Sequence, residues 1–263
     1  MPMAYRRHVL RKWLGLRWRL LIGADDSQVN QRIFGHQIRA TTAKSYELLF
    51  REMFIDLDYW IPDLGPAPVI VDCGCNIGMS ILFFKSQHPD ARVIAFEPNS
   101  TSFELLQDNT VGNGMTGVEL HNCALGAENG EIEFFIDPEN PMSLRASTVE
   151  ARMPAGRTRV AQRRLSDFLD GPVDLVKMDI EGAEAEVISE LVESGAIDRI
   201  QRFILEYHHH IDPADDRLAS FLELLEQAGF GYQVHAHRQF FNHAWRRGRT
   251  FQDIAIFAYR KDA

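Results

Sequence analysis

Short apolar runs alternate with stretches of helical periodicity from residue 69 to the end of the chain. The runs predict strands at 69–71, 92–96, 118–121, 131–136, 173–178, 203–205, 232–237 and 251–259. Helices are predicted before His88-Pro89, from a capping box at Thr101, before Gly195, and over 213–228. Strands alternating with helices are typical of the α/β class. We therefore expect a doubly wound parallel sheet that closes with a C-terminal antiparallel strand.

Residues 1–60 read as a basic, helical extension, and the main domain is expected over 61–263. The first twenty residues contain no acid, and the segment from 31 to 57 is predicted as helical or mixed. The basic residues of the first segment, interleaved with Leu and Trp, are Arg6, Arg7, Arg11, Lys12, Arg17 and Arg19. We expect this helix to pack on its own domain, while the alternative is peripheral contact of residues 1–22 with an anionic membrane surface.

Two polar segments interrupt the alternation and are candidate substrate loops. Residues 137–158 are rich in Pro, Ser and Gly, which predicts a flap. Residues 236–250 combine aromatic residues with the arginines 238, 246 and 247. Such a loop suits an anionic or glycosidic acceptor, or simply packs the end of the sheet. Loop composition does not name the acceptor.

Charge and cysteine content narrow the class of protein. Asp and Glu total 37 against 28 Lys and Arg, a formal net charge of −9, so no nucleic-acid partner is expected. Cys73, Cys75 and Cys123 are too few and too irregularly spaced for a disulfide framework or a structural zinc site. No apolar stretch is long enough for a membrane span or a signal peptide. We expect a cytoplasmic protein, with the membrane-peripheral alternative left open.

A glycine turn follows the first strand of the main domain. It departs from the dinucleotide fingerprint, because Asn76 and Met79 stand where that pattern has glycine. An acid at the start of such a turn disfavours phosphate and favours a ligand that carries an ammonium or sulfonium group. These features predict an S-adenosylmethionine site, with the contributing residues Asp72, Gly74, Cys75, Asn76 and Gly78.

Polar residues also end the next two strands. Glu97, followed by Pro98, ends the second strand, where a carboxylate can accept hydrogen bonds from a ribose diol. Asn122, Cys123 and Ala124 end the third strand and are expected beside the adenine. Taken separately, Glu97 could be a solvated acid and Cys123 a small buried apolar residue. Together they favour a cofactor pocket.

These motifs, in this order, resemble the FkbM-type methyltransferases, over about residues 68–210. The matching blocks are residues 71–78, 96–99, 122–126, 177–184 and 206–208. The resemblance implies a Rossmann-like methyltransferase sheet, S-adenosylmethionine as cofactor, and methylation of a hydroxyl on a small molecule, sugar or glycolipid. It implies an acceptor near Asp179, Glu181, Glu206 and His208. Residues 1–60 lie outside it.

Methyl transfer to an alcohol gains from a base, because the hydroxyl loses its proton as it attacks. His208, with an ordinary pKa of about 6.5, is the best-placed neutral base. Asp179 is the competing base, and it could instead orient the cofactor's amino group. Glu206 would orient His208 or bind sugar hydroxyls. The bland alternative for residues 208–210 is a solvated histidine run.

The acidic residues near position 181 could stabilise a helix instead of binding the acceptor. Glu181 and Glu184 begin a helix, where acids stabilise the positive end of the helix dipole by about 0.3–1 kcal/mol. Lys177 is expected to pair with one of them. Asp179, Glu206, His208 and other histidines offer metal-ligand atoms, but no pair has a diagnostic spacing, so no required metal is expected.

Two other classes of function stay open at this point. A nicotinamide-dependent oxidoreductase would use the same strand ends, although the turn lacks its third glycine. A non-catalytic module that binds the cofactor or docks on membranes is the other alternative. DNA amino methylation is disfavoured, because no Asn/Asp-Pro-Pro-aromatic block follows the fourth strand.

Overall fold

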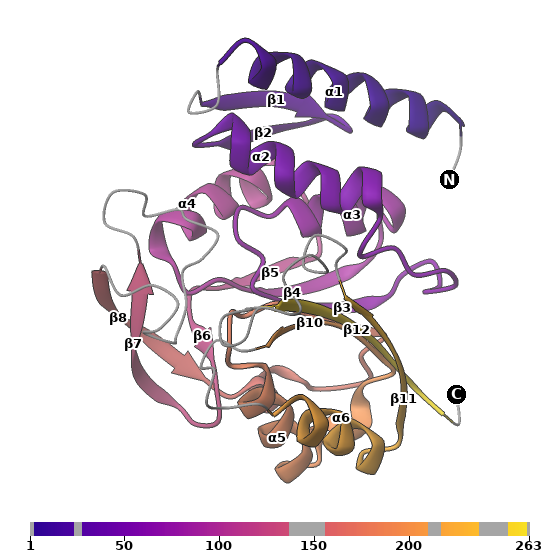
Figure 1. The fold of residues 1–263 in the computed structure, drawn as a ribbon, viewed down its shortest axis with the longest axis vertical. Coiled ribbons are helices and arrows are strands. Elements are labelled where there is room, and N and C mark those ends of the chain that lie inside the picture. Colours follow the sequence, from indigo (N-terminus) through magenta and orange to yellow (C-terminus); the bar gives the residue numbers. More distant parts are fainter. Residues whose placement is uncertain (1–2, 24–27, 137–155, 210–216, 237–251, 262–263) are drawn as a thin grey trace, which may run out of the picture.

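A seven-stranded sheet forms the centre of the molecule in the computed structural model, which describes residues 3–23, 28–136, 156–209, 217–236 and 252–261 (Figure 1). The strand order is β11-β12-β10-β9-β3-β4-β5. In chain order these strands are β3 (Val69–Cys73), β4 (Arg92–Phe96), β5 (Val118–His121), β9 (Leu175–Met178), β10 (Arg202–His209), β11 (Phe230–Ala236) and β12 (Gln252–Arg260).

Five adjacent strands of this sheet, from β10 to β5, are parallel. The strand β12 runs antiparallel between β10 and β11. The chain leaves β3 towards β4 and β5 in one direction, and β9 and β10 lie in the other. This confirms the doubly wound, Rossmann-like α/β sheet with a C-terminal antiparallel strand, and it puts the switch in strand order between β3 and β9.

Helices cover both faces of the sheet. One face carries α2 (Ala43–Phe50), α3 (Met79–Gln87) and α4 (Ser100–Asn109), and the other carries α5 (Glu184–Glu193) and α6 (Leu218–Gln227) (Figure 1). Alternate strand residues feed the two cores: Ile70 and Val93 belong to the first, Val71 and Ile94 to the second. The cap of α4 differs from the expected Thr101 box, because the Asn99 side chain accepts from the backbone N–H groups of Thr101 and Ser102.

Residues 3–23 and 28–40 form an extra layer above α2, α3 and α4 (Figure 1). Helix α1 (Met3–Leu21) leads to an antiparallel hairpin of β1 (Val29–Ile33) and β2 (His36–Ala40). The segment 31–57, expected to be helical or mixed, is mixed: it begins in this hairpin, which turns through Phe34 and Gly35 with positive φ, and continues into α2. This layer shares a hydrophobic cluster with the main sheet. The division at residue 61 stays a prediction.

A small second sheet flanks the molecule, with the order β6 (Ala124–Leu125), β8 (Gly156–Arg163) and β7 (Gly130–Ile136). Residues 137–155 of the expected flap lie outside the described residues, and 156–158 begin β8 instead. Four short helical turns complete the fold: η1 (Arg51–Asp56), η2 (Val111–Asn113), η3 (Leu165–Phe168) and η4 (Ala196–Arg199). Within the described ranges, no helix is both long and apolar enough to cross a bilayer.

Candidate functional site

The turn after β3 and the end of β9 meet where the strand order switches. The backbone N–H of Asp179 donates to the carbonyl of Cys73 at 3.0 Å. Gly74 has a φ of +84°, and a Cβ atom there would lie 1.8 Å from the carbonyl oxygen of Asp179. Only glycine fits this contact. The predicted cofactor turn and the predicted acceptor residue Asp179 are thus in direct backbone contact.

Backbone hydrogen bonds fix the rest of the turn. The N–H groups of Gly74 and Cys75 donate to the carbonyl of Phe96 at 3.0 and 3.1 Å, and that of Gly78 donates to Cys75 at 2.8 Å. Asn76 and Gly78 take positive φ values of 49° and 88°. The turn is therefore held against the end of β4 before α3 begins.

Glu97 is buried at the end of β4 and receives two backbone donors. Its Oε2 accepts from the N–H of Asn76 at 2.9 Å and its Oε1 from that of Asn99 at 2.8 Å. Burial raises the pKa of Glu97 to about 7, although these hydrogen bonds act the other way. Each carboxylate oxygen keeps a further lone pair that can accept from a ligand hydroxyl.

The third predicted segment lies next to Glu97. The side-chain amide of Asn122 donates to the carbonyls of Glu97 at 2.7 Å and Pro98 at 3.2 Å. Cys123 and Ala124 are buried behind it, at the start of β6. The structure thus brings the end of β4 and the end of β5 together, as a pocket for one nucleoside would require.

Asp72 lies beneath the turn and is fully buried. Ser80 Oγ donates to its Oδ2 at 2.5 Å, and Lys177 Nζ lies 3.5 Å from its Oδ1. Lys177 also donates to the carbonyl of Gly74 at 2.8 Å and lies 3.8 Å from Asp179. The expectation that Lys177 pairs with Glu181 or Glu184 was therefore wrong. Lys177 is the register partner of Asp72 on the neighbouring strand β3, so the two side chains lie on the same face of the sheet.

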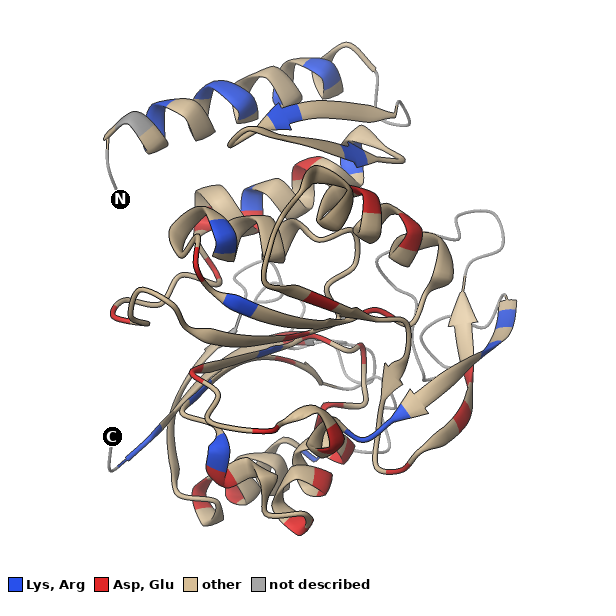
Figure 2. Cartoon of the chain, turned by 180° about the vertical axis from the view of Figure 1, so that it is seen from behind, with Lys and Arg blue, Asp and Glu red and all other residues tan. Residues whose placement is uncertain are grey.

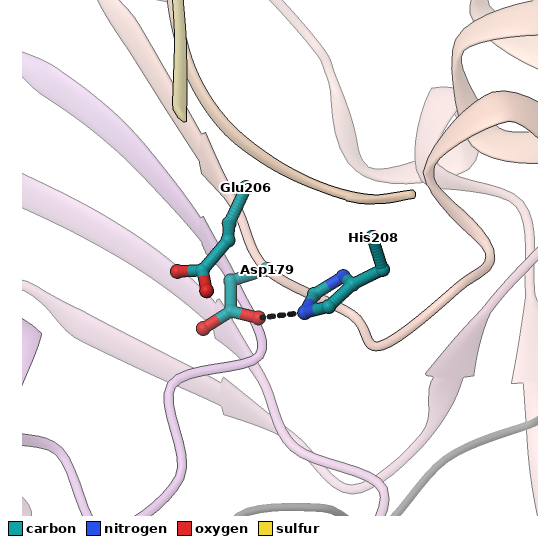
Figure 3. Close-up of side chains that lie close together, drawn as sticks. All are labelled: Asp179, Glu206 and His208. Carbon is teal, nitrogen blue, oxygen red and sulfur yellow. Dashed lines mark ion pairs between the residues drawn. The ribbon is translucent and has the colours of Figure 1, made fainter. Parts of the chain in front are cut away.

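His208 is the centre of a carboxylate cluster on the other side of the switch point. It is buried in β10, so the idea of a solvated histidine run is wrong for His208 and His209. Its Nδ1 bonds Glu184 Oε1 at 2.8 Å, and its Nε2 lies 3.2 Å from Glu181 and 3.6 Å from Asp179. Figure 3 shows Asp179 and Glu206 on the Nε2 side of the ring.

The carboxylates set the charge of His208. Burial alone would lower its pKa, but Glu184, Glu181 and Asp179 outweigh burial and raise the pKa to about 10. The pKa of about 6.5 expected from the sequence is therefore too low for His208 in the folded protein. Despite burial, His208 lowers the pKa of Glu184 in turn. Burial and the charge of Asp179 raise the pKa of Glu206 well above its usual range.

Asp179, Glu206 and His208 could also bring ligand atoms to a cation. One such atom from each residue lies within 4.8 Å of the others. With a pKa of about 10, however, His208 is protonated at neutral pH, and its imidazolium already supplies a positive charge there. Asp179 Oδ1 is buried and accepts no hydrogen bond from the described residues, although it faces His208 and the other oxygen of its carboxylate faces Lys177. It therefore suits a ligand donor such as an amino group.

Glu181 adopts a strained backbone at the start of the acidic block. Its φ is +61°, a conformation that costs a non-glycine residue on the order of 1 kcal/mol. Glu184 Oε1 accepts from the N–H groups of Ile180 and Gly182 at 3.3 and 3.1 Å. Glu184 thereby holds the strained turn and His208 together, which favours a site role over the helix-dipole role considered for these two acids.

Sequence reasoning missed several groups at this site. Asp253 faces His208 across the antiparallel β10–β12 register, 3.8 Å from Nε2. Tyr59 lies with its ring 5.5 Å from Lys177 Nζ, and burial and Asp179 raise the pKa of Glu52 to about 8. Only the β10–β12 register, which the sequence does not reveal, would have identified Asp253. The loop 237–250 and its arginines lie outside the described residues.

Comparisons with known proteins agree with this geometry. The family model described as "Methyltransferase FkbM domain" matches residues 72–234. The chain is 32% identical over 212 residues to Methyltransferase 1 of Beauveria bassiana, covering 72% of this chain and 82% of that protein.

Two further relatives carry more specific names. The 31-O-demethyl-FK506 methyltransferase FkbM of Streptomyces tacrolimicus is 27% identical over 74% of this chain and 86% of its own length. The hexuronic acid methyltransferase AglP of Haloferax volcanii is 26% identical over 78% of this chain and 83% of its own length.

Proposed function

Because the chain belongs to the FkbM family of S-adenosylmethionine-dependent methyltransferases, we propose that it transfers the methyl group to a hydroxyl of a small molecule, sugar or glycolipid. The relative from Streptomyces tacrolimicus, named for 31-O-demethyl-FK506, supports methylation of an oxygen. The relative from Haloferax volcanii, named for a hexuronic acid, supports a sugar acceptor. The observation that carries the proposal is a buried histidine, His208, held at Nδ1 by Glu184 with Nε2 directed at the carboxyl edge of the sheet.

The cofactor half of the site lies at the ends of β3, β4 and β5. Glu97 binds the ribose hydroxyls, Asn122 with Cys123 and Ala124 borders the adenine, and Asp179 binds the amino group. Asp72 does not contact the cofactor itself. It pairs with Lys177, which in turn holds the carbonyl of Gly74 in the turn. S-adenosylmethionine, when bound, supplies a methyl group on an already activated sulfonium.

The acceptor half consists of residues that orient a hydroxyl and take its proton. His208 accepts the proton at Nε2 in its neutral form, whose share grows as pH rises towards the pKa of about 10, while Glu184 stays on Nδ1 and stabilises the imidazolium that forms. Burial and the charge of Asp179 raise the pKa of Glu206, and its protonated form donates a hydrogen bond to the acceptor, while Glu181 accepts one. Much of the acceleration comes from alignment of the reacting atoms. If Asp179 is the base instead, the rate will not follow the titration of His208.

Methyl-labelled S-adenosylmethionine and a panel of glycosides, glycolipids and polyketide alcohols test the proposal. We expect label to enter a product that survives mild alkali, because a methyl ether is stable there and a methyl ester is not. Transfer only to carboxylates or amines would contradict the hydroxyl assignment. In parallel, calorimetric titrations with S-adenosylhomocysteine and with NADH test the cofactor. We expect the protein to bind S-adenosylhomocysteine and not NADH.

A further inference from the structure

Helix α1 is anchored to the body of the protein along one face. Val9 and Leu16 are buried there, at 3% and 1% exposure, and belong to the large hydrophobic cluster. Trp13 Nε1 donates to Glu47 Oε1 at 3.1 Å, and the ring of Tyr5 stacks on that of Phe34 at 4.9 Å. These contacts fix the rotation of the helix, so its opposite face points outward.

That outward face carries a second apolar stripe. With 3.6 residues per turn, Met3, Leu10, Leu14 and Leu21 fall on one side of the helix, and Trp18 lies next to them. Their exposed fractions run from 49% for Leu10 to 75% for Leu21. Ile22, at 64% exposure, directly follows the stripe. The remaining exposed large apolar residues in the described chain are scattered singly, whereas a continuous stripe marks an interaction surface.

Arginines border the stripe on both sides. By the same helical geometry, Arg6 and Arg17 lie along one edge and Arg7 and Arg11 along the other. Figure 2 shows basic residues along α1 and no acidic residue, while acidic residues are spread over the rest of the fold. Arg6, Arg7 and Arg11 form no ion pair in the part of the chain that the structure describes. The stripe with these four arginines is the basic-apolar face.

We propose that the basic-apolar face docks on the surface of an anionic phospholipid membrane, with α1 lying in the plane of the interface. An apolar stripe edged by arginines, with a tryptophan, is the pattern of interfacial helices. A second copy of this chain would bring the same arginines against one another, which opposes that pairing. The proposal is independent of the methyl acceptor, although it would bring the enzyme to a membrane-bound acceptor.

The redox state of the cysteines fits the same location. Cys73, Cys75 and Cys123 are free thiols, as in proteins of the reducing cytoplasm. The cytoplasmic leaflet is the one that carries anionic lipid and attracts basic segments. None of the described helices is long and apolar enough to span the bilayer.

Co-sedimentation of the full chain with vesicles tests the proposal. We expect binding to phosphatidylcholine vesicles that contain phosphatidylglycerol, weak binding to phosphatidylcholine alone, and a decrease with added salt. Arg7→Glu/Arg11→Glu should reduce the bound fraction about tenfold or more. Leu10→Ser/Leu14→Ser should do the same through loss of insertion.

Matched controls separate this face from general charge. Arg92→Glu/Arg159→Glu makes the same charge change at exposed residues away from α1, and Val111→Ser removes an exposed apolar residue elsewhere. Both should bind as the parent does, and S-adenosylmethionine binding by all variants shows that they fold. Equal loss in the control pair would overturn the proposal, as would absence of binding to anionic vesicles. Dimerisation in sedimentation velocity that Leu10→Ser/Leu14→Ser abolishes would show that a second copy covers the face.

Discussion

The two halves of the sheet's carboxyl edge satisfy their carboxylates by different means. On the β3–β4 side, Glu97 accepts from the backbone N–H groups of Asn76 and Asn99. On the β9–β10 side, Glu184 also accepts from backbone N–H groups, but Glu184 and Glu181 in addition face one imidazole, that of His208. Backbone donors do not titrate, whereas an imidazole does. The hydrogen-bond donors to Glu97 therefore stay the same as pH changes. The charge next to Glu184 and Glu181 changes when His208 gains or loses its proton.

Replacing His208 should have the largest effect, and it tests whether the two halves of the edge have separate roles. His208→Ala should lower kcat about 10²- to 10⁴-fold, because the proton acceptor is lost, and leave the Kd for S-adenosylmethionine unchanged. Steady-state kinetics and calorimetry measure the two quantities. His209→Ala, a change at the adjacent buried histidine, is the control and should keep most of kcat. Equal losses in both variants would mean that His208 has only a packing role.

Replacing Glu97 tests the other half. Glu97→Ala should weaken S-adenosylmethionine binding about 10- to 100-fold, the effect of losing charge-assisted hydrogen bonds. We expect kcat at saturating cofactor to change less than the Kd. Glu119→Ala, at an exposed acid on neighbouring β5, is the matched control. A parent-like Kd in Glu97→Ala would remove Glu97 from the cofactor site.

The pH dependence of kcat sharpens the contrast. Only neutral His208 accepts a proton, so kcat should rise with pH towards its pKa of about 10 and not level off near 6.5. Glu184→Gln removes a charge that favours the imidazolium, so the rising limb should move about one to two pH units lower. Glu119→Gln should leave the limb in place. A limb unaffected by Glu184→Gln would favour Asp179 as the base.

Stability should also fall as pH rises. Glu97 and Glu52 have pKa values raised by burial to about 7 and about 8, so between about pH 4.5 and 8 the folded state binds more protons than the unfolded state. His208 contributes stability that is complete below about pH 6.5 and lost as pH rises through about 10. We expect the free energy of unfolding, from urea titrations, to decline from pH 5 to 9. Glu97→Gln should flatten the decline between pH 5 and 7, and an unchanged slope would contradict the raised pKa.

Metal removal should have the smallest effect. With the imidazolium of His208 as the cation of the cluster, chelation by EDTA should leave kcat unchanged at neutral pH, and added Mg²⁺ should not raise it. Loss of activity on chelation, restored by one divalent ion, would instead assign Asp179, Glu206 and His208 to a metal site.

The sequence predicted the parallel strands well because they are apolar runs bounded by turn residues. The predicted limits of β4 and β5 match the structure, and β10 continues beyond its apolar part to include His208 and His209. The β1–β2 hairpin escaped prediction, since Phe34 takes an unusual positive φ at the turn. Strand β8 was missed because it begins with exposed polar residues.

Side-chain partnerships were harder to predict than strand ends. Glu97, Asp179 and His208 could be named because each follows or ends a strand at the same edge of the sheet. Asp253 could not, because its place opposite His208 depends on an antiparallel register that periodicity does not reveal. The pairing of Lys177 with Asp72 likewise requires the β3–β9 alignment.

The contact of Lys177 with the glycine turn has a consequence for the order of folding. The ammonium group and the Gly74 carbonyl that it holds are separated by 103 residues in the chain. Closing a loop of this length costs chain entropy before the contact can stabilise the fold, so we expect this contact to form late. A nascent chain that ends before β9 therefore contains the whole turn without the lysine that fixes it, and we expect it to bind S-adenosylmethionine only once residue 177 has joined the sheet.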